Sequence, residues 1–175
     1  MLLAALLAAP AYAQETGASC ARIEDDPQRL ACYDGVFRSD GEQSDAAGLT
    51  IQSERLIPAL PSGREPAEMA IQCDAGTLSV QFRFAGQLVS ITGGIAPITL
   101  QVDQNATLVR TLRASPDNTA VGFWTTGESS AFIDSLAGGT NLKVRMTPVR
   151  QRSLTVDFRL TEHLGSIREI RDTCR

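Results

Sequence analysis

The sequence has a single histidine, few aromatic residues and no surplus of positive charge. Its 175 residues include 16 Lys and Arg against 20 Asp and Glu, which gives a net charge of -4. Without a basic stripe that could displace counterions, a nucleic-acid binder is disfavoured. One histidine leaves little room for histidine-based metal sites or acid–base catalysis. Hydrophobic residues, at 43%, are ordinary for a globular protein.

The sequence also lacks the short motifs that carry nucleophilic, phosphate-binding or redox chemistry. No G-x-S-x-G, phosphate-binding loop or C-x-x-C occurs. The lone histidine, His163, stands beside Glu162 near the end of the chain, where a partly exposed helix position is favoured over a catalytic base. We therefore expect no enzyme, no metal site and no cofactor.

Only residues 1–13 form a long apolar run. They carry no charge and end in Ala11-Tyr12-Ala13, which is typical of a secretory signal peptide with its cleavage site. A bilayer needs about 20 apolar residues, so the run is too short to span one, and a short buried helix is the alternative. Lipidation of Cys20 is disfavoured because Glu15 interrupts the apolar segment. We expect a periplasmic protein with no transmembrane segment in the mature chain.

The four cysteines, Cys20, Cys32, Cys73 and Cys174, form an even set. In an exported chain cysteines usually pair, and four of them allow three pairings. The spacing favours Cys20–Cys32 as a local bridge and Cys73–Cys174 as a long-range one. On the chain-entropy model the long bridge stabilises the fold by about 4–5 kcal/mol. A structural role is favoured over a redox role.

Residues 14–38 predict a short helical hairpin held by the Cys20–Cys32 bridge. Asp26 followed by Pro27 is typical of a helix start, and Gly35 weakens the helix near its end.

Residues 39–68 are rich in Ser, Asp, Glu, Gly and Pro, and three prolines argue against a regular element. We predict a flexible linker there. The alternative is that Leu56 and Ile57 dock onto a partner.

In residues 69–175 apolar and polar residues alternate, which is typical of antiparallel strands with one buried face. Strands are predicted at 78–84, 98–102, 142–146 and 154–160, and less regular ones at 108–112 and 121–124. Helices are predicted at 129–137 and 161–174. The fold class is mainly β: an antiparallel β-sandwich or half-barrel with a C-terminal helix. The Cys73–Cys174 bridge would tie that helix to the first of these strands.

Two further features are candidates for interaction. Trp124 follows Phe123 at a strand end, so one of the two must face away from the core. A basic outer face could contact an acidic partner or cell-wall phosphate, although such a face is usually only solvated and Asp157 would partly neutralise it. Its members are Lys143, Arg145, Arg150, Arg152 and Arg159.

The start of the chain resembles a known family. The run CARIEDDPQRLACYD at residues 20–34 is similar to the N-terminal signature of the type VI secretion accessory family VasI/TagO, as is the ending of the chain. The resemblance implies a non-enzymatic envelope protein with no catalytic residues. Arg29, Leu30, Tyr33 and Asp34 match the signature as structural positions. Arg29 would pair with Asp25 or Asp26, and Tyr33 would pack on the β-rich domain.

Two hypotheses of different classes follow. The first is a periplasmic accessory protein that mediates protein interaction or assembly, with envelope or secretion-apparatus proteins as partners. The second is a periplasmic ligand-binding or inhibitor module on a β-sandwich, which a deep apolar pocket inside the sheet would favour.

Overall fold

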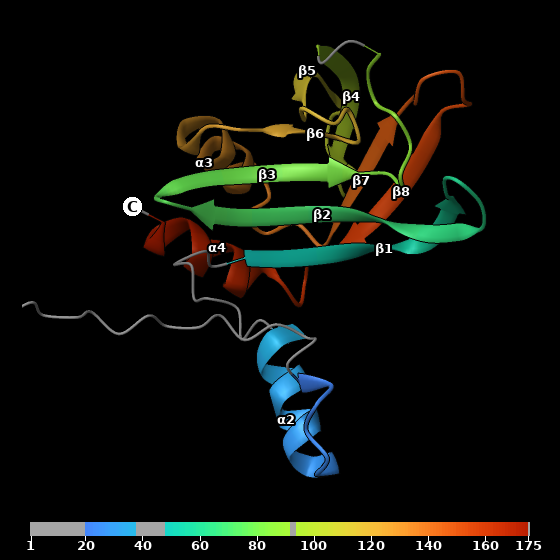
Figure 1. Cartoon of the computed structure of the whole chain (residues 1–175). Helices are drawn as coiled ribbons and strands as arrows, with labels where there is room; N and C mark the ends of the chain where they lie inside the picture. The colour runs from blue at the N-terminus through green and yellow to red at the C-terminus, as the bar shows by residue number, and fades with distance from the viewer. Residues whose placement is uncertain (1–19, 38–47, 92–93, 175) are drawn as a thin grey trace, which may run out of the picture. The chain divides into compact units, whose positions relative to one another are not determined.

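The computed structural model describes residues 20–37, 48–91 and 94–174, without the side chains of Ala31 and of residues 34–37 (Figure 1). Residues 1–13, the predicted signal peptide, lie outside these ranges. The chain divides into two units, Met1–Ser44 and Asp45–Arg175.

The first unit contains helix α2 (Asp26–Phe37) and the Cys20–Cys32 disulfide. The Asp25 carboxylate accepts a hydrogen bond from the Gln28 amide at 3.0 Å, so the helix is capped one residue before the predicted position. Arg29 forms an ion pair with Asp26 and donates to the Ile23 carbonyl at 3.2 Å. The expected pairing of Arg29 is confirmed. The first arm of the predicted hairpin falls largely outside the described residues.

The second unit is an antiparallel sheet of eight strands in the order β1-β2-β3-β6-β5-β4-β7-β8. The end strands β1 and β8 lie side by side, so the sheet is a nearly closed barrel rather than two packed sheets (Figure 1). The strands are β1 (Gly48–Pro58), β2 (Arg64–Asp74), β3 (Thr77–Arg83), β4 (Ile95–Val102), β5 (Leu108–Ala114), β6 (Ala120–Phe123), β7 (Asn141–Met146) and β8 (Leu154–Arg159).

The flexible linker predicted for residues 39–68 is wrong from residue 48 onward, because β1 and the start of β2 occupy this segment. Two of the prolines stand at positions where the missing N–H of proline disturbs strand pairing little. Pro58 ends β1, and Pro66 lies beside an irregularity in the β1–β2 register. Ser53 supports that irregularity, since its hydroxyl donates to the Arg55 carbonyl and accepts from the Ala67 amide, each at 2.9 Å. The polar composition of this segment therefore led to the wrong prediction of a linker where the edge strand β1 lies.

Two helices cover the barrel, α3 (Thr126–Ser135) and α4 (Leu164–Thr173). Helix α3 begins three residues before the predicted start. The Thr125 hydroxyl accepts from the Glu128 amide at 3.4 Å and donates to the Glu128 carboxylate at 2.8 Å, which is a reciprocal cap. Helix α4 lies along β1 and β2 and buries Ile167 and Ile170.

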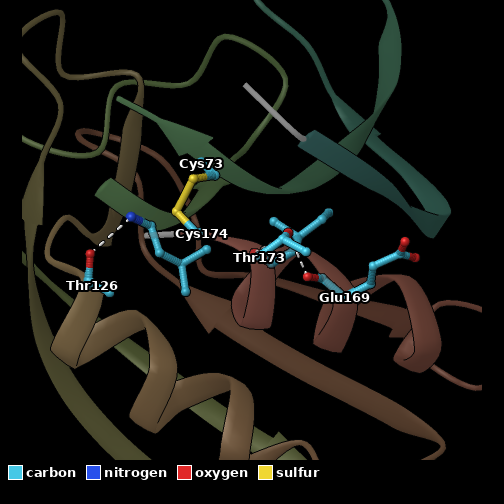
Figure 2. Close-up of a disulfide and its surroundings, with 7 residues drawn as sticks. Cys73, Thr126, Glu169, Thr173 and Cys174 are labelled. Carbon is cyan, nitrogen blue, oxygen red and sulfur yellow. Dashed lines mark hydrogen bonds between the residues drawn. A yellow bond between two sulfur atoms is a disulfide. The ribbon is translucent and has the colours of Figure 1, made fainter. Parts of the chain in front are cut away.

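The long-range disulfide joins Cys73 in β2 to Cys174 at the end of α4, as predicted (Figure 2). Close by, the Leu78 amide donates to the Thr126 hydroxyl at 3.1 Å, which ties the start of α3 to β3. Both helices are thus fastened at the same end of the β2–β3 hairpin.

Phenylalanines join α3 to the sheet. The Phe132 ring stacks on Phe123 of β6 with centroids 4.8 Å apart and meets the Phe82 ring of β3 edge-on at 5.8 Å. Phe82 also contacts Phe158 of β8, at 6.3 Å. These rings are buried and set the position of α3 against β3 and β6.

Candidate binding pocket

A pocket of about 480 Å³ lies between α3 and strands β5 and β6. The Phe123 and Phe132 rings contribute to its apolar wall, and Arg110, Arg113 and Glu128 supply charged groups. Its remaining lining residues are Ile95, Leu108, Thr111, Leu112, Gly122, Trp124, Ala131 and Ser135.

The pocket exists because β5 and β6 separate. They pair only at Arg113–Gly122 and Ala114–Val121, whereas β5 remains paired with β4 as far as Leu108. Strand β6 pairs with β3 on its other side. No described strand pairs with residues 108–112 on the side of α3. We call this edge of β5, together with the pocket beside it, the open seam.

Gly122 stands where β3, β6 and β5 meet. A Cβ atom at this position would clash with the Val80 carbonyl oxygen of β3, so the close approach of the two backbones requires glycine. The junction from which the open seam diverges therefore depends on one residue.

Trp124 follows β6 and lines the pocket, while its neighbour Phe123 is buried in the core. Trp124 is half-buried, and the prediction that it serves as a contact residue stays a prediction. The Trp124 indole N–H donates to the carbonyl of Arg113, one of the two paired residues of β5, at 2.9 Å and so adds a side-chain bond at this junction.

The acidic side chain of the pocket has a hydrogen-bond partner, whereas its two arginines have no described carboxylate partner. The Glu128 carboxylate accepts from the Thr125 hydroxyl. Neither Arg110 nor Arg113 forms an ion pair with any carboxylate that the structure describes, and the Arg110 guanidinium reaches only the Val109 carbonyl, at 3.4 Å. The open seam therefore presents cationic groups.

Apolar side chains are exposed around the mouth of the pocket. Of the residues that line the pocket, Ile95 is 65% exposed and Leu108 39%. Apolar side chains exposed beside a pocket are typical of an interaction site.

Two turns of the β unit are held by carboxylates. Hydrogen bonds from the Ser115 and Thr119 hydroxyls lower the pKa of Asp117 to about 2, in the turn that joins β5 to β6. After β4, the hydroxyl and amide of Thr140 lower the pKa of Asp103, which also accepts from the Asn141 amide at 2.8 Å.

The structure distributes the other predicted interaction residues over separate surfaces. Ile57 is 6% exposed and belongs to the core, so its role as a docking residue is wrong, whereas Leu56 is 50% exposed. Of the N-terminal residues, Tyr33 belongs to the first unit, and its packing on the β-rich domain stays a prediction. The side chain of Asp34 lies outside the described residues.

On the predicted basic face, Arg159 is already paired: its guanidinium reaches the Glu54 carboxylate of β1 at 2.6 Å. Asp157 pairs with Arg55 of β1 at 3.6 Å rather than with a residue of the face itself. Arg145 and Lys143 are exposed on β7. This surface and the open seam are therefore two separate candidates.

Sequence reasoning missed Arg110, Arg113 and the α3 wall of the pocket. The available signal was the irregular strand pattern at residues 108–112, where Leu108 and Val109 place apolar side chains on both faces.

Within the ranges that the structure describes, no group of three or more His, Cys, Asp or Glu could hold a metal ion. None of the described helices is long and apolar enough to span a membrane.

No family model matches the sequence, and no curated protein matches it either. The fold is similar to the crystal structure of invasion associated protein B from Bartonella henselae, with a TM-score of 0.43 and 20% sequence identity. The similarity covers 70% of this chain and 82% of that one. At this level it assigns neither a family nor a function, and the resemblance to the VasI/TagO family has no support from a family model.

Proposed function

We infer that the chain is a non-enzymatic, exported accessory protein that binds another envelope protein at the open seam. One observation carries this proposal: an apolar pocket lies beside a strand edge that has no described partner, and its mouth is rimmed by exposed Ile95 and Leu108. Exposed apolar surface and an unpaired strand edge are both features that proteins normally cover.

Export is supported by the cysteines. All four are joined in two disulfides, which form and persist in oxidising compartments outside the cytoplasm.

The side chains of the pocket support binding rather than catalysis. The Ser135 hydroxyl donates to the Phe132 carbonyl at 2.5 Å, and the Glu128 carboxylate is engaged in the helix cap. Neither is paired with a base, as an activated nucleophile would be. His163 lies at the start of α4 and is not among the residues that line the pocket.

A small-molecule binding module is the second candidate. The pocket volume falls within the range of about 300–1,000 Å³ that such sites occupy. The unpaired edge of β5 beside it favours a protein partner instead, because a small ligand leaves that edge uncovered. A type VI secretion apparatus remains a hypothesis for the partner's source, and it rests on the sequence resemblance at the two ends of the chain alone.

Site-specific photocrosslinking in intact cells tests the proposal. A photoreactive residue at Leu108 should crosslink to one discrete envelope protein, while the same residue at exposed Lys143 of β7 should not. The substitution Ala131→Trp, which fills the pocket from an exposed position on α3, should abolish the crosslink, whereas Ala131→Ser should preserve it. Crosslinking from Lys143 but not from Leu108 would show that the partner binds at the basic face, and this result would overturn the proposal.

A further inference from the structure

Resting on the proposed function, we propose that the partner contributes an extended acidic peptide segment that adds to β5 as a further strand. The segment pairs with the backbones of Val109 and Thr111, and its carboxylate binds Arg110.

The direction of the backbone groups follows from the β4–β5 ladder. The Ala114 amide donates to the Gly94 carbonyl at 2.9 Å, so Ala114 directs its backbone groups towards β4. In an antiparallel ladder these directions alternate, and the β4–β5 register continues without a shift to Leu108. The N–H and C=O groups of Val109 and Thr111 therefore point to the open seam, where no described strand receives them.

The free edge has the length of an ordinary strand. Residues 108–112 extend for about 16 Å at about 3.3 Å per residue, enough to pair with a five-residue segment. The pocket next to the edge leaves room for the side chains of such a segment, between β5 and the Phe132 and Ala131 positions of α3. Strand addition of this type uses main-chain hydrogen bonds for affinity and pockets for alternate side chains.

The positive charge of Arg110 favours an acidic side chain on the added segment. Alternate residues of a strand share a face, so Arg110 lies on the same face as the buried Leu112, and both line the pocket. Arg110 and Arg113 have no described carboxylate partner, and the nearby Glu128 is already hydrogen-bonded. An acidic side chain on the added strand would satisfy Arg110 with a charge-assisted hydrogen bond.

The same charges argue against a second copy of this chain as the occupant. Two β5 edges that paired with each other would bring the Arg110 side chains of both copies onto one face of the seam. Like charges placed opposite each other across paired strands are destabilising.

The test uses a fluorescein-labelled, capped seven-residue peptide with one central glutamate among valines and threonines, titrated with the full chain and followed by fluorescence anisotropy. We expect saturable binding to the native chain. Replacing the glutamate with lysine should weaken binding at least tenfold. Arg110→Gln should weaken it about tenfold, the effect of one charge-assisted hydrogen bond, while Arg145→Gln on β7 should leave it unchanged.

Backbone methylation separates strand addition from unspecific apolar binding. Of two peptides that are N-methylated at alternate sets of amides, only the one whose methyl groups face β5 should lose binding. Equal affinity of both methylated peptides, or of the glutamate and lysine peptides, would overturn the proposal. So would a crosslinked dimer of the chain formed from Leu108, which would identify a second copy as the occupant.

The two proposals can fail separately. If no peptide binds but the Leu108 crosslink to an envelope protein persists and is lost in Ala131→Trp, strand addition is wrong and the open seam is still the partner site. If the crosslink is also absent, the proposed function is wrong as well.

Discussion

The backbone pairing of the barrel is interrupted between β1 and β8 and again between β5 and β6, and the side chains at the two gaps differ. Between the end strands β1 and β8, side chains close the gap: Arg159 reaches Glu54 at 2.6 Å and Arg55 reaches Asp157 at 3.6 Å. Between β5 and β6, no described ion pair crosses the gap, and an apolar pocket opens instead.

The difference shows two ways of managing an unpaired strand edge. At the β1–β8 gap the adjoining hollow is lined by polar residues such as Glu54 and Arg159, which satisfy each other within the chain. At the open seam the arginines of β5 have no described carboxylate, and apolar side chains surround them. A closed edge resists association with other chains, whereas an open one is suited to it.

The largest expected effect concerns the closed side, where the Cys73–Cys174 disulfide fastens α4 beside β1 and β2. The double variant Cys73→Ala/Cys174→Ala should lower the free energy of unfolding by about 4–5 kcal/mol, since the bridge spans 101 residues. Urea denaturation measures this loss. Hydrogen exchange should rise in β1 and β2 more than in β5, and uniform exchange would contradict a local role for the bridge.

Next in size is a substitution at the junction of the open seam. Gly122→Val should destabilise the protein by about 3 kcal/mol, because its side chain meets the Val80 backbone. Gly127→Ala is the matched control: a Cβ there meets nothing, and the better helix propensity should stabilise the protein by about 1 kcal/mol. Chemical denaturation of both variants gives the comparison, and equal signs would refute the steric argument.

A smaller effect is expected from the ion pair that closes the β1–β8 gap. A double-mutant cycle with Glu54→Gln and Arg159→Gln should give a coupling free energy of about 0.5 kcal/mol, because both side chains are largely exposed. The single variant Arg145→Gln, which removes an arginine with no described ion pair, should change stability by less. A coupling of several kcal/mol would mean that this gap is far more rigid than its exposure suggests.

The smallest effect is a pH dependence at the turn between β5 and β6. The pKa of Asp117 is lowered to about 2 by the Ser115 and Thr119 hydrogen bonds, below its ordinary value of 3.8. Its carboxylate therefore stabilises the folded state above about pH 4, and this contribution is lost as the pH falls towards 2. In Asp117→Asn the pH dependence of unfolding between 4 and 2 should be shallower. An unchanged profile would show that this turn does not sense pH.

Some features were predictable because they depend on local pattern. Alternation at Leu142, Val144 and Met146 places three buried side chains on one face of β7, as the structure shows. By contrast, β1 was mistaken for a linker, because an edge strand with one buried face tolerates charges and prolines. The start of α3 was missed for a related reason: its first turn consists of capping residues rather than apolar ones.

The candidate site was less accessible to sequence reasoning. Trp124 was singled out by its position next to Phe123, but its partner, the Arg113 carbonyl, lies on another strand. Arg110 reads in sequence as an ordinary exposed strand residue. Arg110 matters to the candidate site because β6 does not pair with β5 at this position, and no local sequence pattern predicts that missing pairing.

The sequence by itself determined the strand periodicity and the C-terminal helix and favoured the two disulfide pairings, because each depends on spacing along the chain. Only the tertiary structure decided that β6 turns from β5 to β3 at Gly122 and leaves one edge of β5 unpaired. The physical reason is that strand pairing joins segments far apart in the sequence. Whether an edge is covered depends on how all eight strands share the limited set of backbone hydrogen bonds.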